Sequence, residues 1–155
     1  MHLTEVAIII DHANDMEHIR PCKEYLDHFG IRYDVQVLSA MRDPDALDEY
    51  VDKGPERGIK LFIVAAGMGA QSAGVIASKT YVPVIGVPLS TTDVNGVDAL
   101  YAMVQMTEGV PVATVSIGVH GLKNAAVLAA EILSLSDARL KERLRFFKQN
   151  GCKFA

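Results

Sequence analysis

The segment DHANDME, residues 11–17, places several side chains that could do chemistry directly after an apolar run. Asp11 and His12 stand where a strand is expected to end, so they could bind a ligand, and His12 could transfer a proton near neutral pH. Asp15 or Asn14 could instead cap the helix that follows, which is a common role of these residue types. No second histidine stands at the helical spacing of a metal-ligand pair, so we predict no metal here.

A second polar segment, VLSAMRDPDALDEY, covers residues 37–50. The Ser39 hydroxyl, the Arg42 guanidinium and the free amides of a helix start together suit the binding of a phosphate. Asp43 stands in the same turn, where its carboxylate counts against a phosphate site. A carboxylate here is common as a helix cap, which interacts favourably with the positive end of the helix dipole. Met41 lies between the two phosphate-binding candidates, and its side chain cannot transfer a proton at any accessible pH.

The third segment, VAAGMGAQSAGV, is rich in glycine and covers residues 64–75. Gly67, Gly69 and the amides that a helix start leaves free could hold an anion or a carboxylate. The alternative is that the glycines only permit a tight turn between a strand and a helix. A dinucleotide fingerprint would need a third glycine at Ser72, and a P-loop would need a lysine after Gly74. Neither NAD nor ATP is therefore expected as a cofactor.

Alternating strands and helices must position these three segments. Short apolar, β-branched runs predict strands over residues 6–10, 33–38, 61–65, 82–87 and 112–117. Helical spacing predicts helices over residues 19–29, from 43 onward, and over 71–79, 97–106 and 122–135. This alternation predicts an α/β fold, a three-layer α-β-α sandwich with a doubly wound parallel sheet. Ligands of such sheets bind outside the carboxyl ends of the strands. The loops at that edge are expected to begin at Asp11, Ser39, Ala66 and Pro88.

Two further features lie in the C-terminal third of the chain. His120 follows the fifth predicted strand and is a weaker candidate for ligand binding or proton transfer. Residues 137–149 predict a charged amphipathic helix with Leu140, Leu144 and Phe147 on one face. Because a helix beyond the last crossover has little core left to cover, we expect it to pack on a neighbouring subunit. The alternative is that it covers an edge of the sheet.

Composition restricts the class of protein. The chain has 155 residues, half of them apolar, which predicts one domain over residues 1–155. The net charge is −4, and the basic residues form no block, so nucleic acid is not an expected partner. Cys22 and Cys152 are far apart and lack metal-site spacing, which favours a reducing cytoplasm. The N-terminal apolar run is only as long as a strand, so neither a signal peptide nor a membrane span is predicted.

Taken together, these segments resemble the 5-(carboxyamino)imidazole ribonucleotide mutases, the PurE family of purine biosynthesis. The resemblance extends from Val6 to about Phe146. It rests on VAIII followed by ND, on VLSAMRDPD, AAGMGAQSAGVIASKT, PVIGVP and NGVDALYAMVQM, and on GVPVATVSIG followed by NAAVLAAEIL. It implies a flavodoxin-like sandwich, a homo-octamer whose C-terminal helix crosses a subunit boundary, and a reaction without cofactor or metal.

Members of that family move a carboxylate from an exocyclic nitrogen of an imidazole ribonucleotide to a ring carbon, by releasing and recapturing carbon dioxide. The resemblance implies that Asp15, Ser39 and Arg42 contact the ribonucleotide. The full set of predicted substrate-binding residues is Asp11, Asp15, Ser39, Met41, Arg42, Ala66, Gly67, Gly69 and Gln71.

The sequence departs from the family pattern where that pattern handles protons and phosphate. Met41 and Gln71 stand where the resemblance implies histidines, and Asp11 and His12 replace a glycine and a serine. A carboxylate at Asp11 would repel a phosphate about 4 Å away by roughly 4 kcal/mol at an effective dielectric constant near 20. Efficient chemistry by the usual route is therefore not expected, and His12 is the candidate that could have taken over the proton transfer.

Three functions follow from this combination. The first is a diverged isomerase or lyase that acts on a ribonucleotide or a related carboxylated heterocycle. The second is a non-catalytic nucleotide-binding or regulatory paralogue that uses the same cleft. The third is a scaffold whose assembly is its function.

Overall fold

The computed structural model describes residues 3–154, and its centre is a parallel β-sheet. The strands are β1 (Val6–Ile10), β2 (Tyr33–Val37), β3 (Leu61–Ala66), β4 (Val84–Pro88) and β5 (Ala113–Thr114). Their order is β2-β1-β3-β4-β5, with every neighbouring pair parallel. This is the flavodoxin-like order, so the predicted α/β fold with a doubly wound sheet is confirmed.

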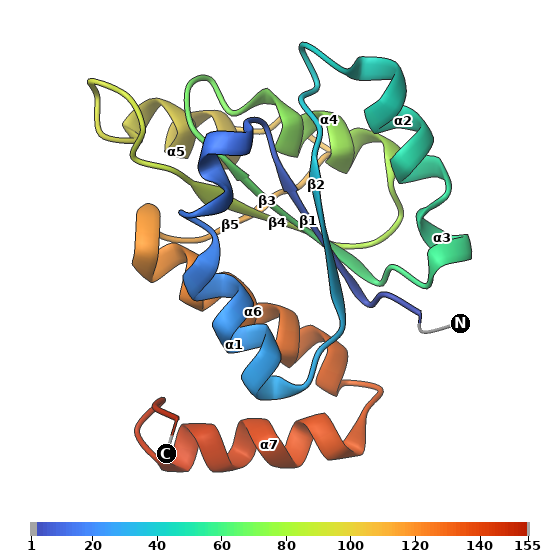
Figure 1. The fold of residues 1–155 in the computed structure, drawn as a ribbon, viewed down its shortest axis with the longest axis vertical. Helices are drawn as coiled ribbons and strands as arrows, with labels where there is room; N and C mark the ends of the chain where they lie inside the picture. Colours follow the sequence, from blue (N-terminus) through green and yellow to red (C-terminus); the bar gives the residue numbers. More distant parts are fainter. Residues whose placement is uncertain (1–2, 155) are drawn as a thin grey trace.

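Helices cover both faces of the sheet (Figure 1). They are α1 (Arg20–Phe29), α2 (Pro44–Asp52), α3 (Gly54–Arg57), α4 (Gln71–Lys79), α5 (Val97–Val104), α6 (Gly118–Ser134) and α7 (Ala138–Gln149), with a short 3₁₀ turn, η1 (Ala13–Met16). Helices α1 and α6 pack together on one face, while α2, α4 and α5 lie on the other. The three layers of the predicted sandwich are therefore present.

The core consists of two apolar clusters separated by the sheet. Side chains of a strand alternate between its faces, so Ile8 and Ile10 contribute to the cluster under α1 and α6. Ala7 and Ile9 contribute to the cluster under α2, α4 and α5. Every residue of β1 and β3 is buried, as expected for central parallel strands covered on both faces.

The first crossover helix shows why the local sequence forms these elements. Cys22, Leu26 and Phe29 are all buried on one side of α1, as their helical spacing predicts. Gly30 ends the helix with φ of 69°, a left-handed conformation that glycine adopts without strain. Its amide donates hydrogen bonds to the carbonyls of Asp27 and Leu26. The predicted helix over residues 19–29 is confirmed, with its start one residue later.

The predicted boundaries around the fifth strand were wrong. Residues 112–117 were expected to form a strand, but β5 contains only Ala113–Thr114 and pairs with β4 alone. Helix α6 starts at Gly118, whereas the sequence predicted a start at Leu122. A Cβ at Gly121 would lie 1.6 Å from the carbonyl oxygen of Ser116, so the first turn of α6 lies directly on the segment that follows β5. This close contact leaves room for only a short β5 and a short connection to α6.

Helix α7 packs on helices α6 and α1 of its own chain. Leu140, Leu144 and Phe147 are buried in the cluster that these helices form. The apolar face that the sequence offers is thus covered within the chain, because the ends of α1 and α6 leave apolar surface beyond the sheet. Packing of α7 on a neighbouring subunit stays a prediction, and it now concerns the exposed side that carries Phe146.

No helix within residues 3–154 combines the length and the apolar character that crossing a membrane requires.

Candidate functional site

A cleft of about 390 Å³ opens at the carboxyl ends of β1, β3 and β4. Its walls come from the loops that follow these strands and from the turn after β2. The lining residues are Asp11, His12, Asn14, Asp15, Arg42, Gly67, Met68, Thr91 and Thr92. The position agrees with the rule that open α/β sheets bind ligands beyond the carboxyl ends of their strands.

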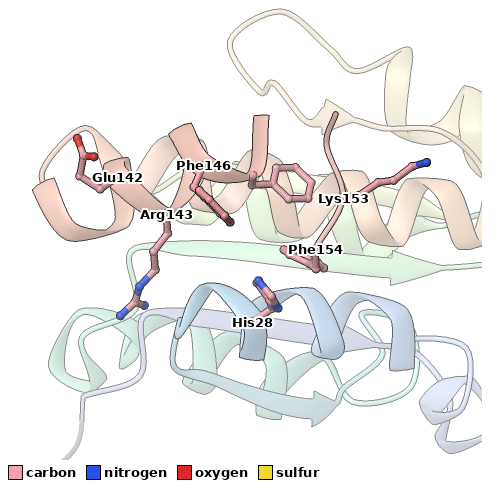
Figure 2. A pocket seen from close by; sticks show the side chains of 7 residues that line it. His28, Glu142, Arg143, Phe146, Lys153 and Phe154 are labelled. Atoms are coloured by element: carbon pink, nitrogen blue, oxygen red, sulfur yellow. The ribbon is translucent and has the colours of Figure 1, made fainter. Parts of the chain in front are cut away.

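A second cavity, of about 430 Å³, lies at the other end of the molecule between α7, the C-terminal segment and α1. Figure 2 shows its aromatic lining, with Phe146, Phe154 and His28 directed toward the same space. The rings of His28 and Phe154 are 3.5 Å apart between centroids. Glu142, Arg143 and Lys153 also line it. Because this cavity is remote from the carboxyl ends of the strands, we take the cleft as the candidate site.

The loop after β1 brings two carboxylates to the cleft in different environments. Asp15 is only 6% exposed, and its Oδ1 lies 3.4 Å from Nδ1 of His18. The Asp15 amide donates to the carbonyl of His12, and the Asp15 carbonyl accepts from the amide of Ile19. Asp15 therefore holds the 3₁₀ turn in place, whereas His12 is exposed at the rim of the cleft.

Asp11 is partly buried and is held by a residue far away in the sequence. The Ser72 hydroxyl donates a hydrogen bond of 2.5 Å to Asp11 Oδ1. Burial raises the pKa of Asp11, and the nearby Asp15 carboxylate acts in the same direction. The Ser72 hydrogen bond and the charge of His12 oppose this rise without cancelling it. Asp11 thus holds its proton to a higher pH than an ordinary aspartic acid.

The turn after β2 is built around buried Ser39. The Ser39 carbonyl accepts from the amides of Arg42 and Asp43, and the Ser39 hydroxyl accepts from the Met41 amide at 3.3 Å. The Asp43 carboxylate accepts from the Ser39 amide at 3.2 Å, so it closes this turn rather than capping α2. Ser39 is therefore a structural centre of the turn, and Arg42 is the member that lines the cleft.

Met41 turns outward from the same turn, with 72% of its surface exposed. The next residue toward the N-terminus, Ala40, donates its amide to the Ser72 hydroxyl at 3.0 Å. Ser72 consequently links the turn after β2 to Asp11 on the loop after β1.

The glycine-rich turn allows close packing at the floor of the cleft. A Cβ at Gly67 would lie 2.0 Å from Oγ1 of Thr91, so only glycine fits there without movement of its neighbour. Gly69 has φ of 69°, and its amide donates to Asp98 Oδ2 at 3.2 Å. That hydrogen bond is the largest cause that lowers the pKa of Asp98. The Thr92 hydroxyl, in the loop after β4, donates a hydrogen bond to the other oxygen of Asp98. Asp98 therefore links the glycine-rich turn to the loop after β4.

About half of the site residues that the sequence predicted lie together in the cleft. Asp11, His12, Asp15, Arg42 and Gly67 all line the cleft. The other five do not line it: Ser39, Met41 and Gly69 lie in the adjoining turns, Ala66 ends β3, and Gln71 begins α4.

His120 lies in the first turn of α6, which begins earlier than predicted, and it does not line the cleft. Within residues 3–154, no three His, Cys, Asp or Glu side chains gather closely enough to hold a metal ion.

Sequence reasoning missed five residues of this region and gave Asn14 only a capping role. Met68, Thr91 and Thr92 line the cleft, Ser72 holds Asp11, and Asp98 holds the glycine turn. The loop starting at Pro88 was the one signal that pointed toward the threonines. Ser72 was considered only as an interruption of a glycine motif.

The protein is a doubly wound, flavodoxin-like α/β protein. This class is defined by the strand order, the two helical layers and a cleft at the carboxyl ends of the strands, next to the point where the strand order reverses. More particularly, the chain belongs to the AIR carboxylase family, whose model matches residues 5–153. This agrees with the resemblance to PurE proteins noted above.

Similar proteins from several organisms match nearly the full chain. An N5-carboxyaminoimidazole ribonucleotide mutase of Saccharolobus solfataricus is 43% identical over 96% of this chain and 92% of the relative. The Bacillus subtilis protein of the same name is 44% identical over 94% of this chain and 90% of its own. The crystal structure of Treponema denticola PurE superposes with a TM-score of 0.86 at 25% identity, covering 96% of this chain and 92% of that structure.

Proposed function

We propose that this chain moves a carboxylate on an aminoimidazole ribonucleotide-like substrate, as an isomerase- or lyase-type enzyme of purine nucleotide biosynthesis. The observation that carries the proposal is the near-complete match to relatives named N5-carboxyaminoimidazole ribonucleotide mutase. A cleft lined by Arg42 at the strand ends supports it. The substrate is a small molecule, and no cofactor is part of the proposal.

Arg42 is proposed to anchor the anionic group of the substrate. Arg42 is the one arginine among the residues that line the cleft. Its guanidinium is suited to charge-assisted hydrogen bonds with a phosphate or a carboxylate. A hydrogen bond to a charged group contributes about 1.5–3 kcal/mol, so Arg42→Ala should raise KM or Kd by roughly 10- to 150-fold. Arg32→Ala, an exposed arginine before β2 at the end of the sheet away from the cleft, is the matched control and should leave both constants unchanged.

The direct test is a steady-state assay with N5-carboxyaminoimidazole ribonucleotide and with its ring-carboxylated isomer. We expect interconversion by the purified chain between about pH 5 and pH 9. Absence of turnover at every pH in that range, with the protein folded, would contradict the proposal.

A non-catalytic nucleotide-binding or regulatory paralogue is the second candidate function. The observation that favours it is that neither Met41 nor Gln71, which flank the cleft, can transfer a proton. In that case calorimetry should find binding of the ribonucleotide without turnover. Introducing Met41→His together with Gln71→His should then create activity, whereas the enzymatic proposal expects activity before any substitution.

We also propose that the chain forms a homo-octamer and works in the cytoplasm. Exposed apolar side chains on the outer helices and loops support assembly, among them Tyr81, Tyr101, Val104, Leu135 and Phe146. Sedimentation velocity should show a species of about eight subunits. A monomer at micromolar concentration would contradict this and would remove the role proposed for the outer side of α7.

A further inference from the structure

Carboxylate transfer between a nitrogen and a ring carbon needs a group that gives and takes one proton, and this inference rests on the proposed function. The titratable side chains that line the cleft are Asp11, His12, Asp15 and Arg42. A proton carrier must be able to change its protonation state near the working pH, and its position relative to the ligand must be held.

Two of the four groups do not meet these conditions. Arg42 keeps its charge at every accessible pH, so it binds anions but carries no proton. Asp15 is only 6% exposed, and it is engaged with His18 while its backbone holds the 3₁₀ turn. The choice therefore lies between Asp11 and His12.

Asp11 is the positioned member of this pair. Its Oδ1 accepts the Ser72 hydroxyl at 2.5 Å, and Ser72 in turn accepts the Ala40 amide at 3.0 Å. The carboxyl group is thus fixed to α4 and to the turn that carries Arg42. This bond uses Oδ1, and Asp11 lines the cleft, so Oδ2 is the oxygen that we assign to the ligand. His12, by contrast, is exposed at the rim.

We propose that Asp11 carries the proton of the carboxylate transfer. Its neutral carboxyl group gives a proton to the exocyclic nitrogen as the bond from nitrogen to the carboxylate breaks, which releases carbon dioxide and leaves an aspartate. The ring carbon then attacks carbon dioxide and forms a carbon–carbon bond. The aspartate removes the hydrogen from that carbon, which restores the aromatic ring and the neutral carboxyl group. One proton leaves Asp11 and one returns, so the reaction is a net isomerisation.

The charges around Asp11 favour this cycle. The groups that act on it are His12 and Asp15 from its own loop and the uncharged Ser72 from α4. Arg42, from the turn after β2, lines the same cleft. Burial raises the pKa of Asp11, which favours the neutral form that the first step requires. A neutral Asp11 also removes the repulsion that an aspartate would exert on the anionic substrate. Substrate binding and proton uptake by Asp11 should therefore be coupled.

The test uses Asp11→Asn, since asparagine can keep the hydrogen bond from Ser72 but cannot carry a proton. We expect kcat to fall at least about 100-fold, the low end of acid–base contributions. Calorimetric affinity for aminoimidazole ribonucleotide should be retained or increased, because a negative charge has been removed. The limb of the pH–rate profile that belongs to Asp11 should disappear. Asp93→Asn, on the exposed loop after β4, is the matched control with unchanged turnover.

A second measurement isolates the proton step. Wild-type protein should exchange the ring hydrogen of aminoimidazole ribonucleotide for solvent deuterium faster than buffer alone, and Asp11→Asn should not. Exchange at the wild-type rate in Asp11→Asn would overturn the assignment, and its loss in His12→Gln would then give the role to His12. Wild-type protein that neither exchanges nor turns over would contradict the proposed function itself, and Asp11 with it.

Discussion

Gly67→Ala is the substitution for which the structure predicts the most specific effect. A Cβ at this position would lie 2.0 Å from Thr91 Oγ1 and 3.3 Å from Thr91 Cβ. Inserting a carbon into such a contact costs about 1–3 kcal/mol. Thr91 is exposed to the cleft, so rotation of its side chain relieves part of the clash. We therefore expect a loss of about 1–2 kcal/mol in the free energy of unfolding.

The decisive experiment is a double-mutant cycle with Thr91→Ala, which removes the oxygen that Gly67→Ala would strike. Urea unfolding at one fixed protein concentration gives the four free energies. The double variant should regain about 1 kcal/mol of the loss. Because Gly67 lines the cleft, Gly67→Ala should also weaken ribonucleotide binding, and the double variant should restore it. A parallel cycle with Thr80→Ala, at the end of α4, should be additive and serves as the control.

The reasoning would be refuted by additive free energies in the Gly67–Thr91 cycle, within about 0.5 kcal/mol. Such a result would mean that the two loops do not touch at the floor of the cleft. An unchanged stability of Gly67→Ala alone would lead to the same conclusion.

Three further predictions concern the core and the loops of the site. Phe147→Ala should lower the free energy of unfolding by about 3–5 kcal/mol, because the ring is 4% exposed and packs on Phe29 at 5.3 Å, whereas Phe146→Ala on the outer side should change it little in the monomer. The hydrogen bonds that Asp98 accepts lower its pKa below the ordinary 3.8, so the ionised carboxylate stabilises the fold fully above that pH. Asp98→Ala should therefore destabilise the protein at pH 7, and acid unfolding experiments should show this destabilisation shrink as the pH falls below about 3.8. Burial raises the pKa of Asp11, so the ionised carboxylate opposes folding at pH values above its ordinary pKa. Asp11→Asn should therefore raise the melting temperature at pH 7, and the difference from the wild type should vanish toward pH 3. Equal melting temperatures at pH 7 would contradict the raised pKa.

The strands and most helices were predictable because their signals are local. Continuous β-branched runs such as residues 61–65 and helical spacing before Gly30 reflect burial on both faces of a strand and on one face of a helix. The fifth strand was overestimated for a physical reason as well. Its apolar run continues to Ile117, but the early return of α6 over Ser116 leaves only two residues paired with β4.

The candidate site was predictable as a place and only partly as a set of contacts. Since all parallel strands end at the same edge, Asp11, Arg42 and Gly67 could be expected to meet. Nothing in the sequence pattern indicated that Ser39 is used inside its own turn, or that Asp43 closes that turn instead of capping α2. These roles depend on hydrogen-bond geometry rather than on residue type.

The amino-acid sequence by itself determined the α/β alternation, the edge of the sheet at which the polar segments gather, and the family. Tertiary structure alone decided that Ser72 ties Asp11 to the turn after β2, that Thr91 faces Gly67, and that the apolar side of α7 is covered by its own chain. The physical reason is that periodicity records which face of an element is buried. Contacts between segments dozens of residues apart are set only when the crossovers bring the strand ends side by side.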